Sequence, residues 1–306
     1  MITPDNPYYR QVQLLVAVLP SVAEERCFAL KGGTAINFFV RDMPRLSVDI
    51  DLAYLPSGDR AVALREIDAA LKRIRAGLQS DSPPLAVRIT KLQDGHACAM
   101  LVRQGDAAVK IEVSPVLRGT VFPSADQRIR PRAEEEFGFA EVPVLSFEDL
   151  FAGKLVAALD RQHPRDLFDV QLLLREEGIS PNLFRAFLVY AISHDGSLAR
   201  IVAPRPKPIA ELFERQFANM TAEPVTVAQL ERTREELIAA LHRNIGENEK
   251  AFLLSFKRGE PRWDLLAVEH VMELPAVRWK LQNLERMERI ARQDAVAELE
   301  RVLARI

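Results

Sequence analysis

Apolar and polar residues recur along the first 120 residues with two different periods. Residues 6–19 and 59–78 carry apolar side chains at helical spacing, which predicts two amphipathic helices. Residues 45–55, RLSVDIDLAYL, alternate with a period of two, as a half-buried strand does. Further strands are predicted at 27–32, 85–92, 96–104 and 107–116, and a short helix at 34–41. The order of these elements indicates a mixed sheet with helices packed on it.

The second half of the chain has a helical pattern throughout. Helices are predicted at 146–162, 164–177, 181–193, 227–245 and 281–306, and the Pro-rich basic segment 202–213 is predicted to be a loop. Residues 128–146 are highly charged and lack periodicity, so we place a domain boundary there. The prediction is an α+β fold, with a mixed β-sheet and flanking helices in residues 1–140 and a mainly helical domain in residues 141–306.

Composition narrows the class of protein only slightly. The 306 residues are 48% hydrophobic and 27% charged with a net charge of −2, which is typical of a globular protein without an overall electrostatic attraction for nucleic acid. No apolar run is long enough to cross a membrane, and the first residues show no secretion signal. The two cysteines, Cys27 and Cys98, have no metal-ligand spacing and are expected to be thiols. We therefore expect a cytoplasmic protein.

The paired acids of the Asp-Ile-Asp stretch raise the first chemical question. On a strand, Asp49 and Asp51 point to the same face, roughly 6.6 Å apart. Two such anions repel each other by about 2.5 kcal/mol at an effective dielectric of 20. Arg45 and Lys31 are the only compensating charges in the local pattern, unless a cation binds. A solvated strand face that carries two acids is the alternative interpretation of this short motif.

Two glycines that precede the aspartates in the sequence strengthen the prediction of a phosphate-binding site. Gly32 and Gly33 follow a predicted strand and precede a predicted helix that begins near Thr34. Backbone amides at such a turn can approach phosphate groups closely. A plain tight turn is the alternative, since glycine is common there. Ser47 lies on the same strand face as the two aspartates, and an adjacent strand can bring Glu112 beside them. An exposed strand face that carries Lys110 and Glu112 is the alternative, and the one favoured by this segment alone.

Charged residues within two apolar helices of the second domain complete the pattern. Lys154 interrupts the apolar run LFAGKLVAAL, where a charge is costly unless it has a partner. Asp166 and Asp169 lie in the first turns of the next helix, where acids are also stabilised by the helix dipole. Arg161 and Arg165 can pair with these acids.

Taken together, these segments resemble the AbiEii-type nucleotidyltransferase toxins of the DNA polymerase β-like nucleotidyltransferase superfamily. The resemblance rests on LKGGTAINFF at 30–39, RLSVDIDL at 45–52, KIEV at 110–113 and SFEDLFAGKLVAALDRQHPRDLFDV at 146–170, in the family's order. It covers roughly the first 175 residues. It implies a nucleotidyltransferase-like sheet, a nucleoside triphosphate substrate, Mg²⁺ or Mn²⁺, and often a cognate antitoxin.

The resemblance also implies a role for each matched residue. The expected metal ligands are Asp49, Asp51 and Glu112, the last less strictly because the family varies there. The catalytic residues are expected to be Asp49, Asp51, Lys154 and Asp166. Contacts with the triphosphate are expected from Gly32, Gly33, Thr34, Ser47, Lys154 and Arg165.

The function predicted from the sequence is the metal-dependent transfer of a nucleoside monophosphate from a nucleoside triphosphate. The acceptor is expected to be RNA such as tRNA, or a protein, and the chain is expected to be the toxin of a toxin–antitoxin or phage-defence system. The alternatives are a non-catalytic binding protein on the same fold and an Asp-x-Asp glycosyltransferase. Two basic segments, 128–132 and 200–208, are candidate tracks for a polynucleotide acceptor.

Overall fold

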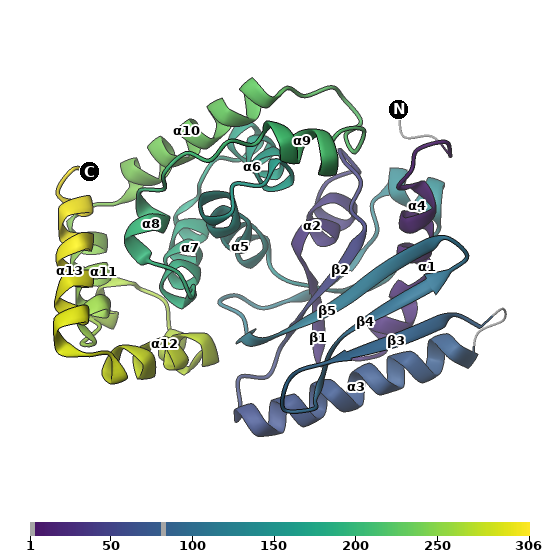
Figure 1. The fold of residues 1–306 in the computed structure, drawn as a ribbon, viewed down its shortest axis with the longest axis horizontal. Coiled ribbons are helices and arrows are strands. Elements are labelled where there is room, and N and C mark those ends of the chain that lie inside the picture. Colours follow the sequence, from purple (N-terminus) through teal and green to yellow (C-terminus); the bar gives the residue numbers. More distant parts are fainter. Residues whose placement is uncertain (1–3, 81–83) are drawn as a thin grey trace. The chain divides into compact units, whose positions relative to one another are not determined.

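The computed structural model describes residues 4–80 and 84–306, and it divides into two compact units (Figure 1). Unit 1 comprises the chain up to Ser146 together with Ala218–Pro224. Unit 2 comprises Phe147–Phe217 and Val225–Ile306. The first part of unit 1 therefore ends six residues after the boundary placed at residue 140. Unit 1 also includes a segment from the second half of the chain.

A mixed sheet is the framework of unit 1. Within the described residues it has seven strands in the order β3-β4-β5-β2-β1-β7-β6. The strands are β1 Phe28–Lys31, β2 Asp49–Tyr54, β3 Ala86–Lys91, β4 Ala97–Gln104, β5 Ala107–Arg118, β6 Ala125–Arg128 and β7 Glu141–Val144. Strand β2 is central, antiparallel to β1 and parallel to β5.

Helices of unit 1 cover the apolar face of this sheet. Helix α1 (Tyr9–Ala23) contacts β5 and β7, and α3 (Arg60–Ser80) contacts β3, β4 and β5. Figure 1 shows α3 running along β3 and β4. The remaining helical segments are α2 Gly32–Ala35, the π-helical turn η1 Ile36–Val40 and α4 Pro131–Phe137. The sheet residues that face α1 and α3, such as Ile50 and Ile111, are fully buried.

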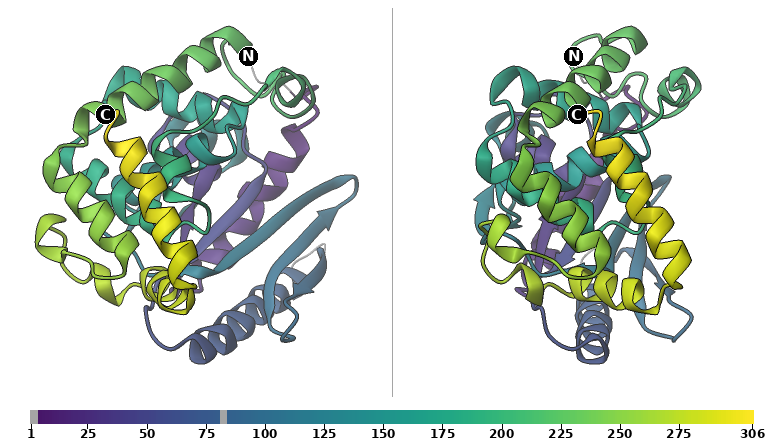
Figure 2. Two further views of the ribbon diagram at one scale, coloured as in Figure 1. Left: turned by 60° about the vertical axis from the view of Figure 1, so that its left-hand side comes forward. Right: turned by 90° about the vertical axis from the view of Figure 1, so that its left-hand side faces the viewer.

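Unit 2 consists of helices packed around α5. They are α5 Phe147–Asp160, α6 Pro164–Glu176, α7 Pro181–Ser193, α8 Leu198–Val202, α9 Ala210–Gln216, α10 Val227–Asn244, α11 Glu247–Arg258, η2 Trp263–Leu265, η3 Val271–Glu273, α12 Pro275–Arg286 and α13 Arg289–Leu303. Helix α5 contacts α6, α7 and α8, and α10 contacts α6. Helices α11 and α13 lie side by side (Figure 2). The predicted α+β fold is confirmed.

Three elements of unit 1 were not predicted. Strands β6 and β7 and helix α4 lie within or beside residues 128–146, the charged segment without periodicity. Strand β7 is short and contains Pro143, yet it lies inside the sheet, between β1 and the edge strand β6. Four residues with a proline give too weak a local signal, so the neighbouring strands decide this assignment.

Two predicted boundaries near the site also shifted. The short helix begins at Gly32, two residues before the predicted start, and continues as a π-helical turn. Strand β2 begins at Asp49 rather than at residue 45, so Ser47 precedes the strand. No helix in the described part of the chain is long and apolar enough to cross a membrane.

Candidate active site

The predicted site residues fall into two groups, one in each unit. In unit 1, strand β2 presents Asp49 and Asp51 on the polar face of the sheet. In the register of the sheet, Asp51 lies opposite Lys31 on β1 and opposite Glu112 on β5. Asp49 lies opposite Lys110 on β5. Since opposed residues share a face, the strands bring all five charged side chains to one surface.

Lys110 supplies positive charge beside the two aspartates. Its ammonium group is ion-paired with the Glu112 carboxylate, and both side chains are about half exposed. The pKa of Lys110 is raised, chiefly by the hydrogen bond to Glu112, with Asp49 and Asp51 adding to the effect. Arg45 and Lys31 were the expected compensating charges, and Lys110 of the neighbouring strand is a further cation that senses both aspartates.

The metal-binding capacity of this surface rests on the aspartate pair. Among the described residues, no group of three or more His, Cys, Asp or Glu side chains is arranged to hold a metal ion. Glu112 is engaged with Lys110 and does not form a three-carboxylate cluster with the aspartates. Two partly buried carboxylates still fit Mg²⁺, which commonly takes one or two carboxylates and completes its shell with phosphates and water. The ligand roles of the three acids remain predictions.

The glycine turn packs directly against the acids. Gly32 has a φ of 75°, and a Cβ atom added to it would lie 2.5 Å from Oδ2 of Asp51. A Cβ added to Gly33 would lie 2.8 Å from Nη2 of Arg45 and 2.9 Å from Oγ of Ser47. The Thr34 hydroxyl donates a hydrogen bond of 2.6 Å to the backbone carbonyl of Asp49. Thr34 thus connects the turn to the start of β2, and the glycines leave the space that the polar side chains fill.

We expect Gly33→Ala to lower nucleotidyl transfer at least tenfold. The added methyl group would displace Arg45 or Ser47, and overpacking of this kind costs about 1–3 kcal/mol. Gly58→Ala is the matched control, because a Cβ at Gly58 meets nothing within 4 Å. Initial rates of both variants at saturating donor are the measurement. Equal activity of the two would show that the packing of Gly33 has no bearing on the site.

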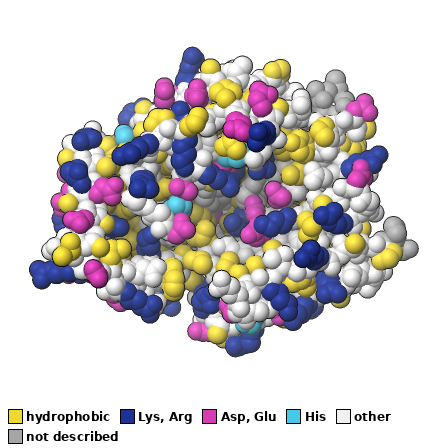
Figure 3. Space-filling view, viewed as in Figure 1, with side chains coloured by type: hydrophobic (Ala, Val, Ile, Leu, Met, Phe, Trp, Pro, Cys, Tyr) yellow, Lys and Arg dark blue, Asp and Glu magenta, His cyan; other side chains and the backbone are white. Residues whose placement is uncertain are grey.

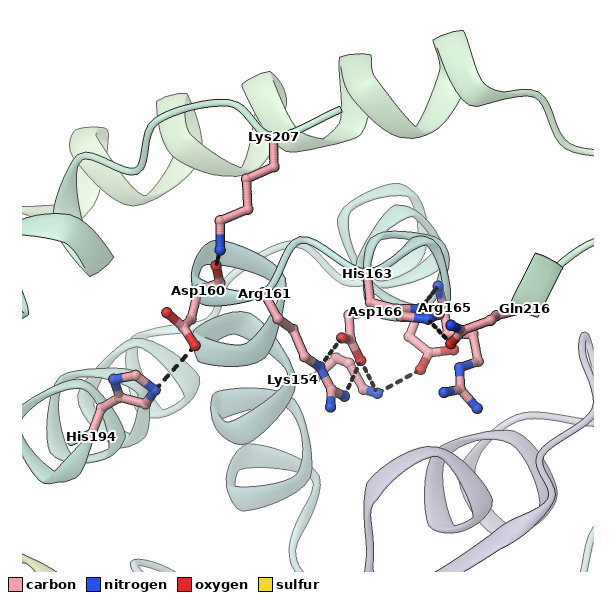
Figure 4. Close-up of polar contacts among 10 residues, drawn as sticks. Lys154, Asp160, Arg161, His163, Arg165, Asp166, His194, Lys207 and Gln216 are labelled. Atoms are coloured by element: carbon pink, nitrogen blue, oxygen red, sulfur yellow. Dashed lines mark hydrogen bonds and ion pairs between the residues drawn. The ribbon is translucent and has the colours of Figure 1, made fainter. Parts of the chain in front are cut away.

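A cluster of buried charges forms the second group, in unit 2 (Figure 4). The Lys154 ammonium on α5 lies 2.9 Å from Oδ1 of Asp166 and 3.0 Å from Oδ2 of Asp169, both on α6. Arg161 donates from Nε to Oδ2 of Asp166 at 2.6 Å. Lys154 is 6% exposed and the two aspartates at most 1%, whereas the Arg161 side chain is 62% exposed. The cluster is therefore anchored in the core and carries its most accessible cation at Arg161.

The charges of this cluster stabilise one another. Burial alone would raise the pKa of Asp166, but Lys154 and Arg161 outweigh burial and hold it well below the usual range. Lys154 was predicted to offset the charge of a triphosphate. Its position between two buried carboxylates also gives it a structural role, because it neutralises them. Arg165 is the second residue of α6 and donates its backbone N–H to Nδ1 of His163; its contact with the triphosphate remains a prediction.

His163, which sequence reasoning overlooked, caps the helix that carries Asp166. Its Nδ1 accepts a hydrogen bond of 3.1 Å from the backbone N–H of Arg165, and its Nε2 lies 3.1 Å from Oε1 of Gln216. The ring must therefore be neutral, with its proton on Nε2. A residue that can accept a hydrogen bond, followed by proline at the first helical position, is a signal that could have revealed this cap.

We expect the stability of unit 2 to fall as the pH drops below about 6.5. Burial lowers the pKa of His163, so the folded chain keeps the ring neutral while the unfolded chain takes up a proton. The stability contributed by the neutral cap is present above the unfolded pKa and is lost as the pH falls towards the folded pKa. His163→Asn keeps a neutral acceptor and should flatten this part of a melting-temperature profile. An unchanged slope in the variant would assign the pH dependence to another group.

The two basic segments proposed as acceptor tracks make several contacts within the fold. Arg128 lies in β6, is ion-paired with Glu134 and stacks over Phe139, while Arg130 and Arg132 lie at the start of α4. In the Pro-rich segment, the Lys207 ammonium donates to the carbonyl of Asp160 at 2.6 Å. On the face seen in Figure 3, basic and acidic side chains are interspersed. The charges of Arg128 and Lys207 are thus partly used within the fold.

Comparison with known proteins supports the fold and identifies the family. A solved structure of MenT4, a nucleotidyltransferase toxin from Mycobacterium tuberculosis H37Rv, is similar with a TM-score of 0.59 and 17% sequence identity, over 92% of this chain and 95% of that one. At this identity the similarity shows the fold. No curated protein sequence matches significantly. The family described as "Nucleotidyl transferase AbiEii toxin, Type IV TA system" matches residues 13–283, most of the chain. The chain therefore belongs to the AbiEii family of nucleotidyltransferase toxins of type IV toxin–antitoxin systems.

Proposed function

We propose that this nucleotidyltransferase uses a divalent cation, Mg²⁺ or Mn²⁺, to move a nucleoside monophosphate from a nucleoside triphosphate to a hydroxyl group of RNA, such as tRNA, or of a protein. The observation that carries this proposal is the packing of Asp51 against Gly32, next to Asp49 on the same face of β2. Two carboxylates beside a glycine turn put oxygen ligands for a cation next to backbone amides that phosphate groups can approach.

Asp49 and Asp51 would hold the cation, which when bound supplies Lewis-acid polarisation of the phosphoryl oxygen. The sheet keeps their carboxylates in place, because β1 and β5 flank β2 on both sides. Gly32 and Gly33 expose backbone that phosphate oxygens can approach. Lys110 adds positive charge along the same face, where the triphosphate carries negative charge.

In unit 2, the buried charge cluster orients the guanidinium group of Arg161, which can then bind an anionic ligand. Asp166 accepts two hydrogen bonds from Arg161, at 2.6 and 3.0 Å, and so orients its planar guanidinium group. Lys154 keeps Asp166 ionised in the core. An oriented, accessible arginine is suited to phosphate, which it can contact with two parallel N–H groups. We propose that Arg161 of unit 2 contacts a phosphate group and that Lys154 offsets negative charge on the triphosphate.

Label transfer tests the proposal most directly. Each of the four nucleoside triphosphates, labelled at the α-phosphate, is incubated with total RNA or total protein, the purified chain and Mg²⁺ or Mn²⁺. We expect label from at least one triphosphate to appear in a macromolecule, and to disappear with a chelator or in Asp49→Asn. Binding of triphosphate without transfer would favour a non-catalytic protein. Transfer of sugar from a nucleotide sugar would favour a glycosyltransferase.

We expect expression of the chain to arrest bacterial growth through this activity, and a cognate antitoxin to relieve the arrest. Membership of a toxin family supports this expectation. We propose that the chain acts in the cytoplasm. Growth curves with wild type and Asp51→Ala, at matched protein levels, are the measurement. Equal arrest by both proteins would separate toxicity from catalysis.

A further inference from the structure

A segment from the second half of the chain completes the surroundings of the glycine turn. We call Ala218–Pro224 the strap. It belongs to unit 1, although α9 and α10, which precede and follow it in the chain, belong to unit 2. The backbone N–H of Leu46 donates to the carbonyl of Met220 at 2.7 Å, and that of Ala222 donates to the carbonyl of Pro44 at 2.9 Å. These two bonds form an antiparallel bridge between Arg45 and Thr221.

The strap is itself anchored in unit 1. Met220 is 1% exposed, so its side chain is part of the core. The carbonyl of Asn219 accepts a hydrogen bond of 2.8 Å from the Asn6 side chain, and Asn219 has a φ of 65°, which asparagine tolerates better than most residues. A buried side chain and a fixed turn therefore hold the strap in one position.

Residues 44–47, which the strap holds, lie against Gly33. The peptide groups of Leu46 are held on both sides, since its N–H bonds to Met220 and its carbonyl accepts a hydrogen bond of 2.7 Å from Nη1 of Arg45. The Arg45 guanidinium and the Ser47 hydroxyl, both buried, occupy the space where a Gly33 side chain would be. Residues 44–48 precede β2 and lack the regular ladder that holds the strand. The strap supplies backbone hydrogen-bond partners for the carbonyl of Pro44 and the N–H of Leu46.

We propose that the strap is a positioning element for the triphosphate site, with Met220 and Ala222 acting through Arg45 and Ser47 on the glycine turn. This inference rests on the proposed function, since it assumes that phosphates bind at Gly32 and Gly33. The buried Arg45 places a positive charge next to the turn, and the strap determines where that charge lies. A displaced strap would let residues 44–48 relax, which would lower phosphate affinity before it lowered the stability of the sheet.

Two proline variants of the full chain separate positioning from general stability. Ala222→Pro removes the N–H that bonds to Pro44, whereas the N–H of Thr221 makes no backbone hydrogen bond across the bridge, so Thr221→Pro is the matched control. The probe is magnesium tripolyphosphate, measured by calorimetry. We expect Ala222→Pro to bind it about tenfold more weakly and to raise KM for the donor triphosphate more than it lowers kcat, with Thr221→Pro close to wild type.

The possible outcomes are distinct. Wild-type affinity in Ala222→Pro, with only a lowered melting temperature, would overturn the positioning role and leave the strap purely structural. A wild-type chain that neither binds tripolyphosphate nor transfers label would overturn the proposed function, and the strap proposal with it. If Ala222→Pro does not fold, Asn6→Ala releases the strap at Asn219 instead. It should then show a smaller loss of affinity in the same direction, and unchanged affinity would overturn the proposal.

Discussion

Asp51→Asn is expected to lower nucleotidyl transfer by about a thousandfold. Lewis-acid stabilisation of a phosphoryl transition state is worth several kcal/mol, and each 1.36 kcal/mol corresponds to a factor of ten in rate. The amide keeps the shape of the side chain beside Gly32 but cannot hold the cation as a carboxylate does. Rates of label transfer over a range of Mg²⁺ concentrations are the measurement, and excess Mg²⁺ should restore little of the loss.

Stability distinguishes this explanation from a structural one. Asp49 and Asp51 repel each other across one strand, so Asp51→Asn should melt at the wild-type temperature or higher without metal. A large drop in melting temperature would instead indicate that Asp51 holds the fold together. Glu112→Gln is the informative companion, because Glu112 pairs with Lys110 in the structure. A loss of rate as large as that of Asp51→Asn would assign Glu112 to the metal after all.

Lys154→Met is expected to destabilise the protein by about 3–5 kcal/mol at pH 7. The variant removes the cation between two buried carboxylates, and loss of one partner from a buried ion pair leaves an uncompensated charge. Arg161 still contacts Asp166, but Lys154 is the partner that bridges both aspartates. Chemical denaturation of wild type and variant at matched pH measures the difference. A change below about 1 kcal/mol would show that water compensates the carboxylates.

Lowering the pH should reduce the difference in unfolding free energy between Lys154→Met and wild type. In wild type the pKa of Asp166 is lowered, so its contribution is present at neutral pH and is lost only as the pH falls through the folded value. In the variant, the aspartates are buried without Lys154, so we expect their pKa to be raised. Folding is then accompanied by proton uptake, and the variant becomes more stable as the pH falls. The two stabilities should converge towards pH 4. The triple variant Lys154→Met, Asp166→Asn, Asp169→Asn should recover part of the loss at pH 7.

Much of the site in unit 1 was predictable because its parts are close in sequence. The period of two in residues 45–55 placed Asp49 and Asp51 on one face, and the charge at Glu112 on a later strand was expected beside them. The register of β2 and β5 confirms that neighbourhood. Its detail was only partly predictable: Lys110 and Glu112, two residues apart on β5, were expected on one strand face, but the place of their ion pair beside the aspartates depends on the pairing of β5 with β2. The packing of Asp51 against Gly32 depends on the same tertiary contacts.

The sequence by itself determined the fold class, the family and the identity of the paired aspartates, because periodicity and short motifs are properties of neighbouring residues. Only the tertiary structure decided which cation lies beside the aspartates, that Lys154 is enclosed by Asp166 and Asp169, and that the strap returns to residues 44–46. The hydrogen bond between the strap and the stretch before β2 joins Ala222 and Pro44, which are 178 positions apart (222 − 44). No local pattern encodes such contacts, because they form only when distant backbone groups must find hydrogen-bond partners in the same core.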